Sequence, residues 1–371
     1  MILPFNDKYV DQTIALWNDT AAREGYKEMT IESFRETFTK NKYFNRDGAF
    51  VSTDEQGKVD GFACGIIADD LPYGDKGGFL TCAISAQFDK TAAESISEAL
   101  TARVEAFFTA SGKTQSNVIF FNPIMLPWYI KDTPKHEHNN APGAPTDGSW
   151  YKSLLRGGYE VRSVERAMYL NLSDFTKTEY MYKKEAGCSA LGYEVVLYDK
   201  TRHTGLAQSL AAYHNPLWER EIQDAADKGV PFLVAAVINA TSASGVTNAA
   251  VAENESYTDV AANLTPASAI GTVTGFAGPI ISVAGFAGPI IPSPSGRGYF
   301  SGIAVHPDHE KRGLGSVLFY NLCDEFKKAG ARYMSLYTGV NNPALHIYEK
   351  AGFRPAREFA VMRKELAQSN G

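Results

Sequence analysis

The sequence predicts an α/β protein of two similar domains, each with a central mixed, largely antiparallel sheet flanked by helices. Three observations lead to this prediction. The chain has 371 residues, more than one hydrophobic core usually organises. Strand and helix patterns follow one another in the same order in both halves. Two segments, 151–159 and 345–353, each have the pattern of a helix that is stopped by glycine and followed by an aromatic residue.

The first half begins with a short strand and an amphipathic helix and continues into a sheet. Alternating apolar residues mark the strands, and the long helix is rich in alanine, glutamate and leucine. The expected order is strand 2–5, helix 9–17, strands 49–53, 59–67 and 78–85, helix 91–108, strand 117–121, helix 150–156 and strand 159–172.

The second half repeats this plan, so we interpret the chain as a tandem duplication; two unrelated domains with similar strand and helix order are the alternative. The predicted domains are 1–173 and 191–371, joined by a charged, helical linker at 174–190. The expected order is strand 193–198, helical segment 206–228, strands 231–237, 273–291 and 299–305, helix 313–328, strand 333–337, helix 343–350 and a closing strand from 353.

Two unusual segments interrupt the second half. Residues 239–271 consist mostly of small and polar types that bury little surface, which indicates a surface insertion. Residues 272–281 are echoed by 282–291, both ending in Gly-Phe-Ala-Gly-Pro-Ile-Ile, as expected for a hairpin or for a strand with a looped-out copy. The apolar stretch 270–292 is long enough to span a bilayer, but its glycines and prolines favour strand pairing over a membrane span.

Composition excludes several classes of protein. A formal net charge of −6 argues against broad binding to nucleic acid phosphates. The four cysteines, Cys64, Cys82, Cys188 and Cys323, are too scattered for a disulfide framework, so we expect reduced core thiols. The N-terminus lacks the pattern of a signal peptide, which favours a cytoplasmic protein.

A glycine loop in the second half has the character of an anion site. It comprises Lys311, Arg312, Gly313, Leu314, Gly315 and Ser316, between strand 299–305 and an amphipathic helix. Alternate glycines let backbone N–H groups and the positive end of the helix face an anion such as a pyrophosphate. The loop lacks a full GxGxxG and the GK[ST] of a P-loop, which disfavours a dinucleotide or a nucleoside triphosphate.

A second motif lies about 27 residues beyond the loop and runs from Asn341 to Phe353. The strand, the glycine loop and the pattern N-x-x-A-x-x-x-Y-x-x-x-G-F occur here in the order found in the GNAT acetyltransferase superfamily, which residues 299–365 resemble closely. The tandem arrangement resembles mycothiol synthase, a two-copy member of that superfamily.

The resemblance implies roles for individual residues around an acetyl-CoA co-substrate. Backbone groups of Ile303, Ala304 and Val305 would pair with the pantetheine arm and polarise the thioester carbonyl. The six loop residues would hold the pyrophosphate, and Asn342 would hydrogen-bond the cofactor near its thiol. Tyr348 would be the general acid that returns a proton to the leaving thiolate; the alternative is a tyrosine that only packs on the sheet. The chemistry needs no metal.

Some positions depart from the superfamily pattern. Glu310 stands where Gln or Arg is usual, and we expect the loop to tolerate it if its side chain points to solvent or pairs with a neighbouring cation. In the first half, an ungapped alignment places Ala92 and Glu94 on Gly313 and Gly315, and the closing helices place Leu154 on Tyr348. The first copy is therefore expected to be catalytically silent and to shape the acceptor cleft.

The acceptor site is less clearly marked. His214, Trp218 and Glu219 mix aromatic and titratable groups as a ligand pocket would, although a corner between helices explains them equally well. His136 and His138 lie in a proline-rich segment without further metal ligands, so we expect a lid or surface loop rather than a metal site.

The sequence thus predicts an acyltransferase that moves an acetyl group from acetyl-CoA to a primary amine of a small molecule, by direct attack in a ternary complex. The alternatives are another acyl-CoA donor, or a CoA-binding sensor or scaffold without catalysis. We expect a monomer or homodimer, with neither a nucleic acid nor a membrane as partner.

Overall fold

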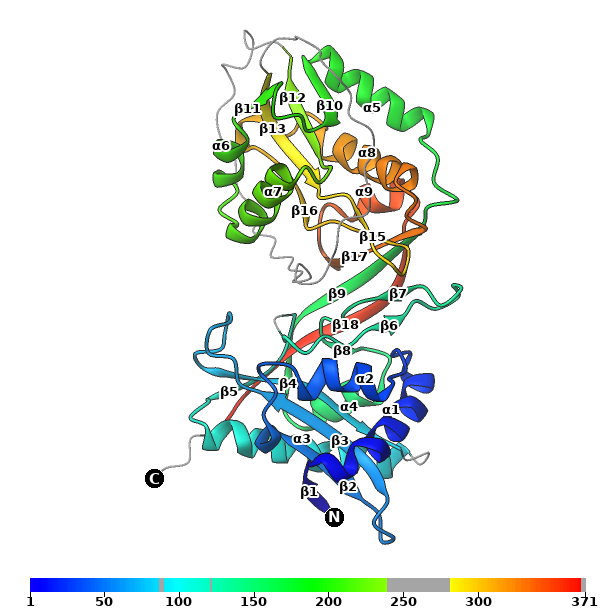
Figure 1. The fold of residues 1–371 in the computed structure, drawn as a ribbon, viewed down its shortest axis with the longest axis vertical. Coiled ribbons are helices and arrows are strands. Elements are labelled where there is room, and N and C mark those ends of the chain that lie inside the picture. Colours follow the sequence, from blue (N-terminus) through cyan, green and yellow to red (C-terminus); the bar gives the residue numbers. More distant parts are fainter. Residues whose placement is uncertain (87–89, 121, 239–280, 368–371) are drawn as a thin grey trace. The chain divides into compact units, whose positions relative to one another are not determined.

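The structure is a computed structural model that describes residues 1–86, 90–120, 122–238 and 281–367. The chain divides into two compact units, which are described separately below (Figure 1). Unit 1 comprises Met1–Met168, Tyr337–Asn341 and Pro355–Gly371, and unit 2 comprises Tyr169–Leu336 and Asn342–Arg354.

Unit 1 contains a mixed sheet in which all neighbours are antiparallel except the central pair β4 and β5. The strands follow one another across the sheet as β1 (Ile2–Pro4), β2 (Ala49–Thr53), β3 (Val59–Ile66), β4 (Gly77–Ser85), β5 (Gln115–Val118) and β18 (Arg354–Glu365). The short strands are β6 (Trp128–Tyr129), β7 (Glu137–His138) and β8 (Ala144–Pro145).

Helices cover both faces of this sheet (Figure 1). They are α1 (Val10–Glu24), α2 (Ile31–Phe34), α3 (Lys90–Ala110) and α4 (Ser149–Arg156). Gly61 and Gly65 of β3 have no room for a Cβ because Leu100 and Val104 of α3 lie against them. On the other face, Phe34 of α2 and Phe62 of β3 lie in an aromatic cluster, and both are fully buried.

The strands of unit 2 form two groups that belong to separate sheets. In the first, β10 (Tyr193–Leu197), β12 (Leu233–Val237), β13 (Ile281–Gly288) and β16 (Gly302–Val305) pair antiparallel in that order, and β11 (His203–Thr204) lies parallel to β13. In the second, β15 (Arg297–Tyr299) pairs antiparallel with β14 (Ile291–Pro292) and parallel with β17 (Tyr333–Gly339).

Helices also cover both faces of the first of these groups. On one face lie α6 (Leu206–Ala211) and α7 (Pro216–Lys228), where Trp218 packs against Gly302. On the other lie α8 (Leu314–Lys328) and α5 (Glu179–Ala190), with Leu318 of α8 packed against Gly285 of β13. The short helix α9 (Leu345–Lys350) packs beside α8.

The last strand of each half belongs in part to the other unit. β18, at the end of the chain, pairs with β5 of unit 1, from Met362 opposite Val118 to Glu365 opposite Gln115. Conversely, β9 (Glu160–Asn171) ends in unit 2, where the N–H of Leu172 donates to the carbonyl of Arg332 at 3.0 Å. The contacts therefore group residues from 355 on with unit 1, whereas the sequence division placed them in the second domain. Residues 174–190, which were predicted to link the two domains, contain α5 and fall within unit 2.

The predicted elements occur in the predicted order, although α2, β6, β7, β8 and β11 were not predicted and one predicted strand is broken. The predicted continuous strand 299–305 is broken between β15 and β16, because its two parts pair with different partners. The insertion 239–271 and the first copy of the repeat, up to 280, lie outside the described residues, whereas the second copy forms β13 and the start of β14. All four cysteines are buried and form no disulfide. Among the described residues, no helix is long and apolar enough to cross a membrane.

Candidate functional site

The break between β15 and β16 leaves one edge of β16 without a partner strand in the described part of the chain. β15 pairs with β17 at Arg297 and Gly298, but β16 pairs only with β13 among the described strands. The N–H of His306 donates to the carbonyl of Ala284 on β13 at 2.8 Å. Because successive N–H groups of a strand alternate in direction, those of Ile303 and Val305 point away from β13. Ala304, the third predicted residue, directs its N–H into the sheet.

The glycine loop continues directly from this edge. Lys311 and Gly313 both have left-handed backbones, with φ of 60° and 83°, and Gly313 stands at the N-cap of α8. A Cβ on Gly315 would lie 3.9 Å from the Val305 side chain, so the loop and the end of β16 are adjacent. Leu314 is buried and anchors the first turn.

The first turn of α8 presents three N–H groups without acceptors. No side chain caps the helix, and the N–H of Val317 is the first that donates to a carbonyl, that of Gly313 at 3.2 Å. The N–H groups of Leu314, Gly315 and Ser316 have no hydrogen-bond partner among the described residues. Such a set, at the positive end of a 15-residue helix, suits an anion.

The charged side chains of the loop point in different directions. The Arg312 guanidinium donates to the hydroxyl of Tyr193 and lies 3.2 Å from Nδ1 of His309. These contacts hold the guanidinium at Tyr193, the first residue of β10. Burial, followed by the neighbouring His306, lowers the pKa of His309, which favours the neutral imidazole in this contact. Lys311 and Glu310 are exposed and have no ion-pair partner in the described chain.

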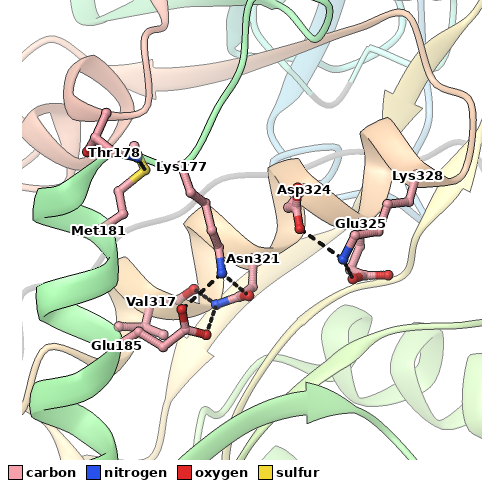
Figure 2. Close-up of polar contacts among 9 residues, drawn as sticks. All are labelled: Lys177, Thr178, Met181, Glu185, Val317, Asn321, Asp324, Glu325 and Lys328. Carbon is pink, nitrogen blue, oxygen red and sulfur yellow. Dashed lines mark hydrogen bonds and ion pairs between the residues drawn. The ribbon is translucent and has the colours of Figure 1, made fainter.

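The helix between the two halves fixes the loop from the other side, and sequence reasoning missed this role. Figure 2 shows Lys177, just before α5, between Glu185 of α5 and Asn321 of α8; its ammonium donates to them at 3.0 and 2.8 Å. At the far end of α5, the thiol of Cys188 donates to the carbonyl of Arg312 at 3.3 Å. The charged sequence of residues 174–190 indicated a helix with polar contacts, but it did not indicate that this helix packs on α8.

Tyr348 lies beside α8, with its ring packed and its hydroxyl unpartnered. Its ring meets Phe319 edge-on at 4.9 Å and lies 6.2 Å from Phe353. Its hydroxyl has no hydrogen-bond partner in the described part of the chain. Burial raises its pKa to about 12, so the phenol stays protonated at neutral pH and can donate. Both interpretations from the sequence, packing and proton donation, fit this position.

Asn342 precedes α9, and the oxygen of its side-chain amide accepts a hydrogen bond. Its Oδ1 accepts the N–H of Ala344 at 2.8 Å, which fixes the start of the short helix. The amide nitrogen has no hydrogen-bond partner among the residues with described positions, so it can donate to a ligand.

The residues predicted for the acceptor separate into one structural residue and two exposed ones. The Trp218 indole N–H donates to the carbonyl of Ser301 at 3.1 Å, and a Cβ on Gly302 would meet the ring at 2.5 Å. Trp218 therefore braces the break between β15 and β16. His214 and Glu219 are exposed, and their side chains make no contact with another described residue through a hydrogen bond or ion pair.

The two histidines of the first half lie in a core, so the expectation of a surface loop is wrong for them. His136 and His138 are 6% and 1% exposed. The ring of His138 stacks on Trp128 with centroids 6.1 Å apart and lies 4.2 Å from that of Tyr337. Within the described ranges, no group of three or more His, Cys, Asp or Glu side chains is arranged to hold a metal ion.

Comparison with known proteins finds a family match for the part of the chain that carries this geometry. Residues 253–353 match the model of the acetyltransferase (GNAT) family. No curated protein sequence matches the chain.

Solved structures show the same fold over almost the whole chain. A GCN5-related glucosamine N-acetyltransferase region of a fungal multi-domain β-N-acetylglucosaminidase matches 98% of this chain with a TM-score of 0.60 and 13% identity, and this chain spans 38% of that protein. A GCN5-related N-acetyltransferase from Sphaerobacter thermophilus gives 0.55 at 10% identity, over 99% and 95% of the two chains. A tandem GNAT protein from the clavulanic acid biosynthesis pathway gives 0.51 at 12%, over 100% and 99%.

The split strand, the glycine loop and the residues after it thus lie in a domain that the family model recognises by sequence, within a fold shared with tandem proteins. Residues 253–353 thus resemble the acetyltransferase (GNAT) family, and the chain shares its fold with a GCN5-related N-acetyltransferase and with a tandem GNAT protein.

Proposed function

We propose that unit 2 transfers an acetyl group from acetyl-CoA to a primary amine of a small molecule, by direct attack in a ternary complex. The observation that carries this proposal is the pair of backbone donor sets on the edge of β16 and at the start of α8, which have no partner among the described residues. They are adjacent through Val305 and Gly315. The donors spaced along β16 match an extended ligand such as the pantetheine arm. The donors gathered at the start of α8 match the pyrophosphate at the end of that arm.

The residues of the site have separate tasks in this proposal. The N–H groups of Ile303 and Val305 bind the pantetheine arm and stabilise the oxyanion that forms on the thioester carbonyl. One such donor contributes about 3 to 4 kcal/mol to many acyl transfers. The N–H groups of Leu314, Gly315 and Ser316 bind the pyrophosphate, assisted by Lys311. The amide nitrogen of Asn342 donates to the cofactor near its sulfur.

Tyr348 completes the reaction. The neutral amine attacks the thioester carbon, the C–S bond breaks, and the electron pair of that bond goes to sulfur. The Tyr348 hydroxyl donates its proton to sulfur as the bond breaks, and the proton lost by the amine nitrogen restores the phenol. The products are an amide and free thiol. His214 and Glu219 remain our candidates for contacts with the acceptor, while Trp218 holds the strand that carries the donors.

A substitution of Tyr348 tests the proposal. In Tyr348→Phe, the ring and its packing remain but the proton donor is lost, so kcat should fall by about 100- to 1,000-fold, while the Kd for acetyl-CoA changes by less than about twofold. Release of free thiol from acetyl-CoA with a panel of small amines gives kcat, and calorimetry gives Kd. Tyr198→Phe, in which a half-buried tyrosine stacked on Phe232 is altered, serves as control and should keep full activity.

The outcomes distinguish the alternatives. A catalyst loses turnover in Tyr348→Phe and keeps affinity. Unchanged kcat would remove Tyr348 from the mechanism. Tight binding of acetyl-CoA without turnover on any amine would favour a sensor or scaffold, and faster turnover with a longer acyl-CoA would replace the acetyl donor. A net charge of −6 supports a small amine over a nucleic acid as acceptor. We also propose a cytoplasmic monomer or homodimer.

A further inference from the structure

Two exposed lysines, one on α5 and one on α9, come together at a single tyrosine without a carboxylate partner among the described residues. Lys184 of α5 and Lys350 at the end of α9 make no ion pair with any described residue. The Lys184 side chain reaches the loop, since its Cδ is 4.0 Å from the place of a Cβ on Gly313. The two ammonium groups lie over the ring of Tyr180, 5.7 and 5.8 Å from its centroid. Two helices far apart in sequence thus bring two cations to one aromatic ring.

The docking of α5 fixes this arrangement. Tyr180, Lys184 and Cys188 are spaced by four residues and lie on one stripe of the helix. Cys188 contacts the carbonyl of Arg312, while Lys177 and Glu185 bind Asn321 in the middle of α8 (Figure 2). The helix is therefore held at both ends, and its stripe leads from the glycine loop to Tyr180.

The matching cation of the first half is neutralised. In the alignment of the closing helices, Arg156 stands at the position of Lys350. Arg156 binds Glu94 at 2.9 Å and Glu98 at 2.7 Å. Glu94 aligns with Gly315 of the loop and Glu98 with Phe319, so both carboxylates are missing from unit 2. A cation that lacks both of these carboxylates and lies beside a second cation at Tyr180 suits an external anion.

The ring between the two cations is itself exposed. Tyr180 is 43% exposed, so its ring is accessible to a ligand. An exposed aromatic ring can bind a nucleobase by stacking, and lysines next to the ring can bind a phosphate of the same ligand. This combination suits a phosphorylated purine nucleoside whose other end is a pyrophosphate.

We propose that α5 and the end of α9 bind the 3′-phosphorylated adenosine of the acyl-CoA. Tyr180 stacks on the adenine, and Lys184 and Lys350 contact the 3′-phosphate, while the loop holds the pyrophosphate. The proposal rests on the proposed function, and it adds the linker helix to the cofactor site. Recognition of the 3′-phosphate makes the enzyme distinguish CoA from 3′-dephospho-CoA.

The test compares acetyl-CoA with 3′-dephospho-acetyl-CoA as ligands of the full chain, by calorimetry at fixed ionic strength. The wild type should bind the dephosphorylated ligand about 10-fold more weakly or worse, because two charge-assisted contacts are lost. Lys184→Gln and Lys350→Gln should each weaken acetyl-CoA about 3- to 10-fold and leave the dephosphorylated ligand almost unchanged. The double variant should bind both ligands with similar affinity.

Matched control variants distinguish the loss of a specific charge from a general loss of folding. Lys183→Gln alters the neighbouring lysine of α5, which is already paired with Glu179 at 2.7 Å, and should keep the full preference for acetyl-CoA. Tyr180→Ala should weaken both ligands about fivefold or more through lost stacking, whereas Tyr180→Phe should bind both as the wild type does. A double variant that still prefers acetyl-CoA by the wild-type factor would overturn the proposal, and so would a wild type that binds the two ligands equally.

Failure here is distinguishable from failure of the proposed function. If acetyl-CoA binds and is turned over but the 3′-phosphate makes no difference, only this inference falls. If acetyl-CoA neither binds nor reacts with correctly folded protein, both fall.

Discussion

The starts of α3 in unit 1 and α8 in unit 2 are aligned in sequence but differ in what they present. At the start of α8, Gly315 contributes no side chain and three N–H groups have no acceptor among the described residues. At the corresponding place in α3, Glu94 extends a carboxylate that Arg156 binds at 2.9 Å. In unit 1 an internal ion pair therefore occupies the start of α3, whereas in unit 2 the start of α8 can bind an anion. A shared fold does not imply a shared ligand.

The strands beside these two helices also differ in whether they leave room for a ligand. In unit 1, the amide of Asn122 donates to the Thr81 hydroxyl at 2.9 Å beyond the parallel pairing of β4 and β5. A cavity of only about 10 Å³ remains there, room for about one water. Leu154, aligned with Tyr348, is 1% exposed and lies in the core. These features support the hypothesis that unit 1 binds no acyl-CoA and has no general acid.

The largest change in affinity is expected when the carboxylate found at the start of α3 is introduced at the aligned position of α8. Gly315→Glu reproduces Glu94 and should weaken acetyl-CoA by about 100-fold or more, because a carboxylate meets the pyrophosphate and a side chain blocks the backbone. The fold should tolerate it, since only Val305 lies within 4 Å of the new Cβ. Calorimetry measures the affinity, and Gly315→Ala, which adds bulk without charge, should lose less. Equal affinity in Gly315→Glu and wild type would break the comparison.

A smaller effect concerns the turn itself. Gly313→Ala forces an alanine into a left-handed backbone with φ of 83°, which should lower the free energy of unfolding by about 1 to 2 kcal/mol. Gly187→Ala is the matched control, because this glycine lies inside α5 with open space around it, and it should stabilise by about 0.5 to 1 kcal/mol. Urea denaturation measures both. A Gly313→Ala protein as stable as wild type would show that the turn relaxes without cost.

The reverse change in unit 1 should have a modest effect. Glu94→Gln removes one carboxylate from Arg156, which keeps Glu98 at 2.7 Å. We expect the free energy of unfolding to fall by less than about 1 kcal/mol and the affinity for acetyl-CoA to stay unchanged. Appearance of a second acetyl-CoA site in this variant would mean that Glu94 alone keeps unit 1 empty.

The smallest effect concerns pH and belongs to unit 2 alone. Burial lowers the pKa of His309 from 6.5, so the unfolded chain takes up this proton first. The stability contributed by the neutral ring is therefore complete above pH 6.5 and is lost as the pH falls below it. His309→Gln should be less stable than wild type at pH 7.5, and the difference should shrink at pH 5.5. Urea denaturation at both values measures this difference, and one that grows in acid would contradict the sign.

The sequence predicts local features of this protein well and long-range ones poorly. The glycine loop, Asn342 and Tyr348 lie within short motifs, and the structure places them around the start of α8 and on α9. The break between Tyr299 and Gly302 depends on pairing with β17 and β13, which no local pattern reveals. The same holds for the addition of β18 to unit 1, for the burial of His138 against Tyr337, and for the docking of α5 on α8. Each requires knowing which distant segments meet.

The number of acetyl-CoA molecules bound per chain tests the central claim most directly. Calorimetric titration of the wild type should give one site, and titration of Gly315→Glu should give none at the same concentrations, while Glu94→Gln still gives one. Two sites of similar affinity in the wild type, or one site that survives Gly315→Glu, would contradict the assignment of the cofactor to unit 2.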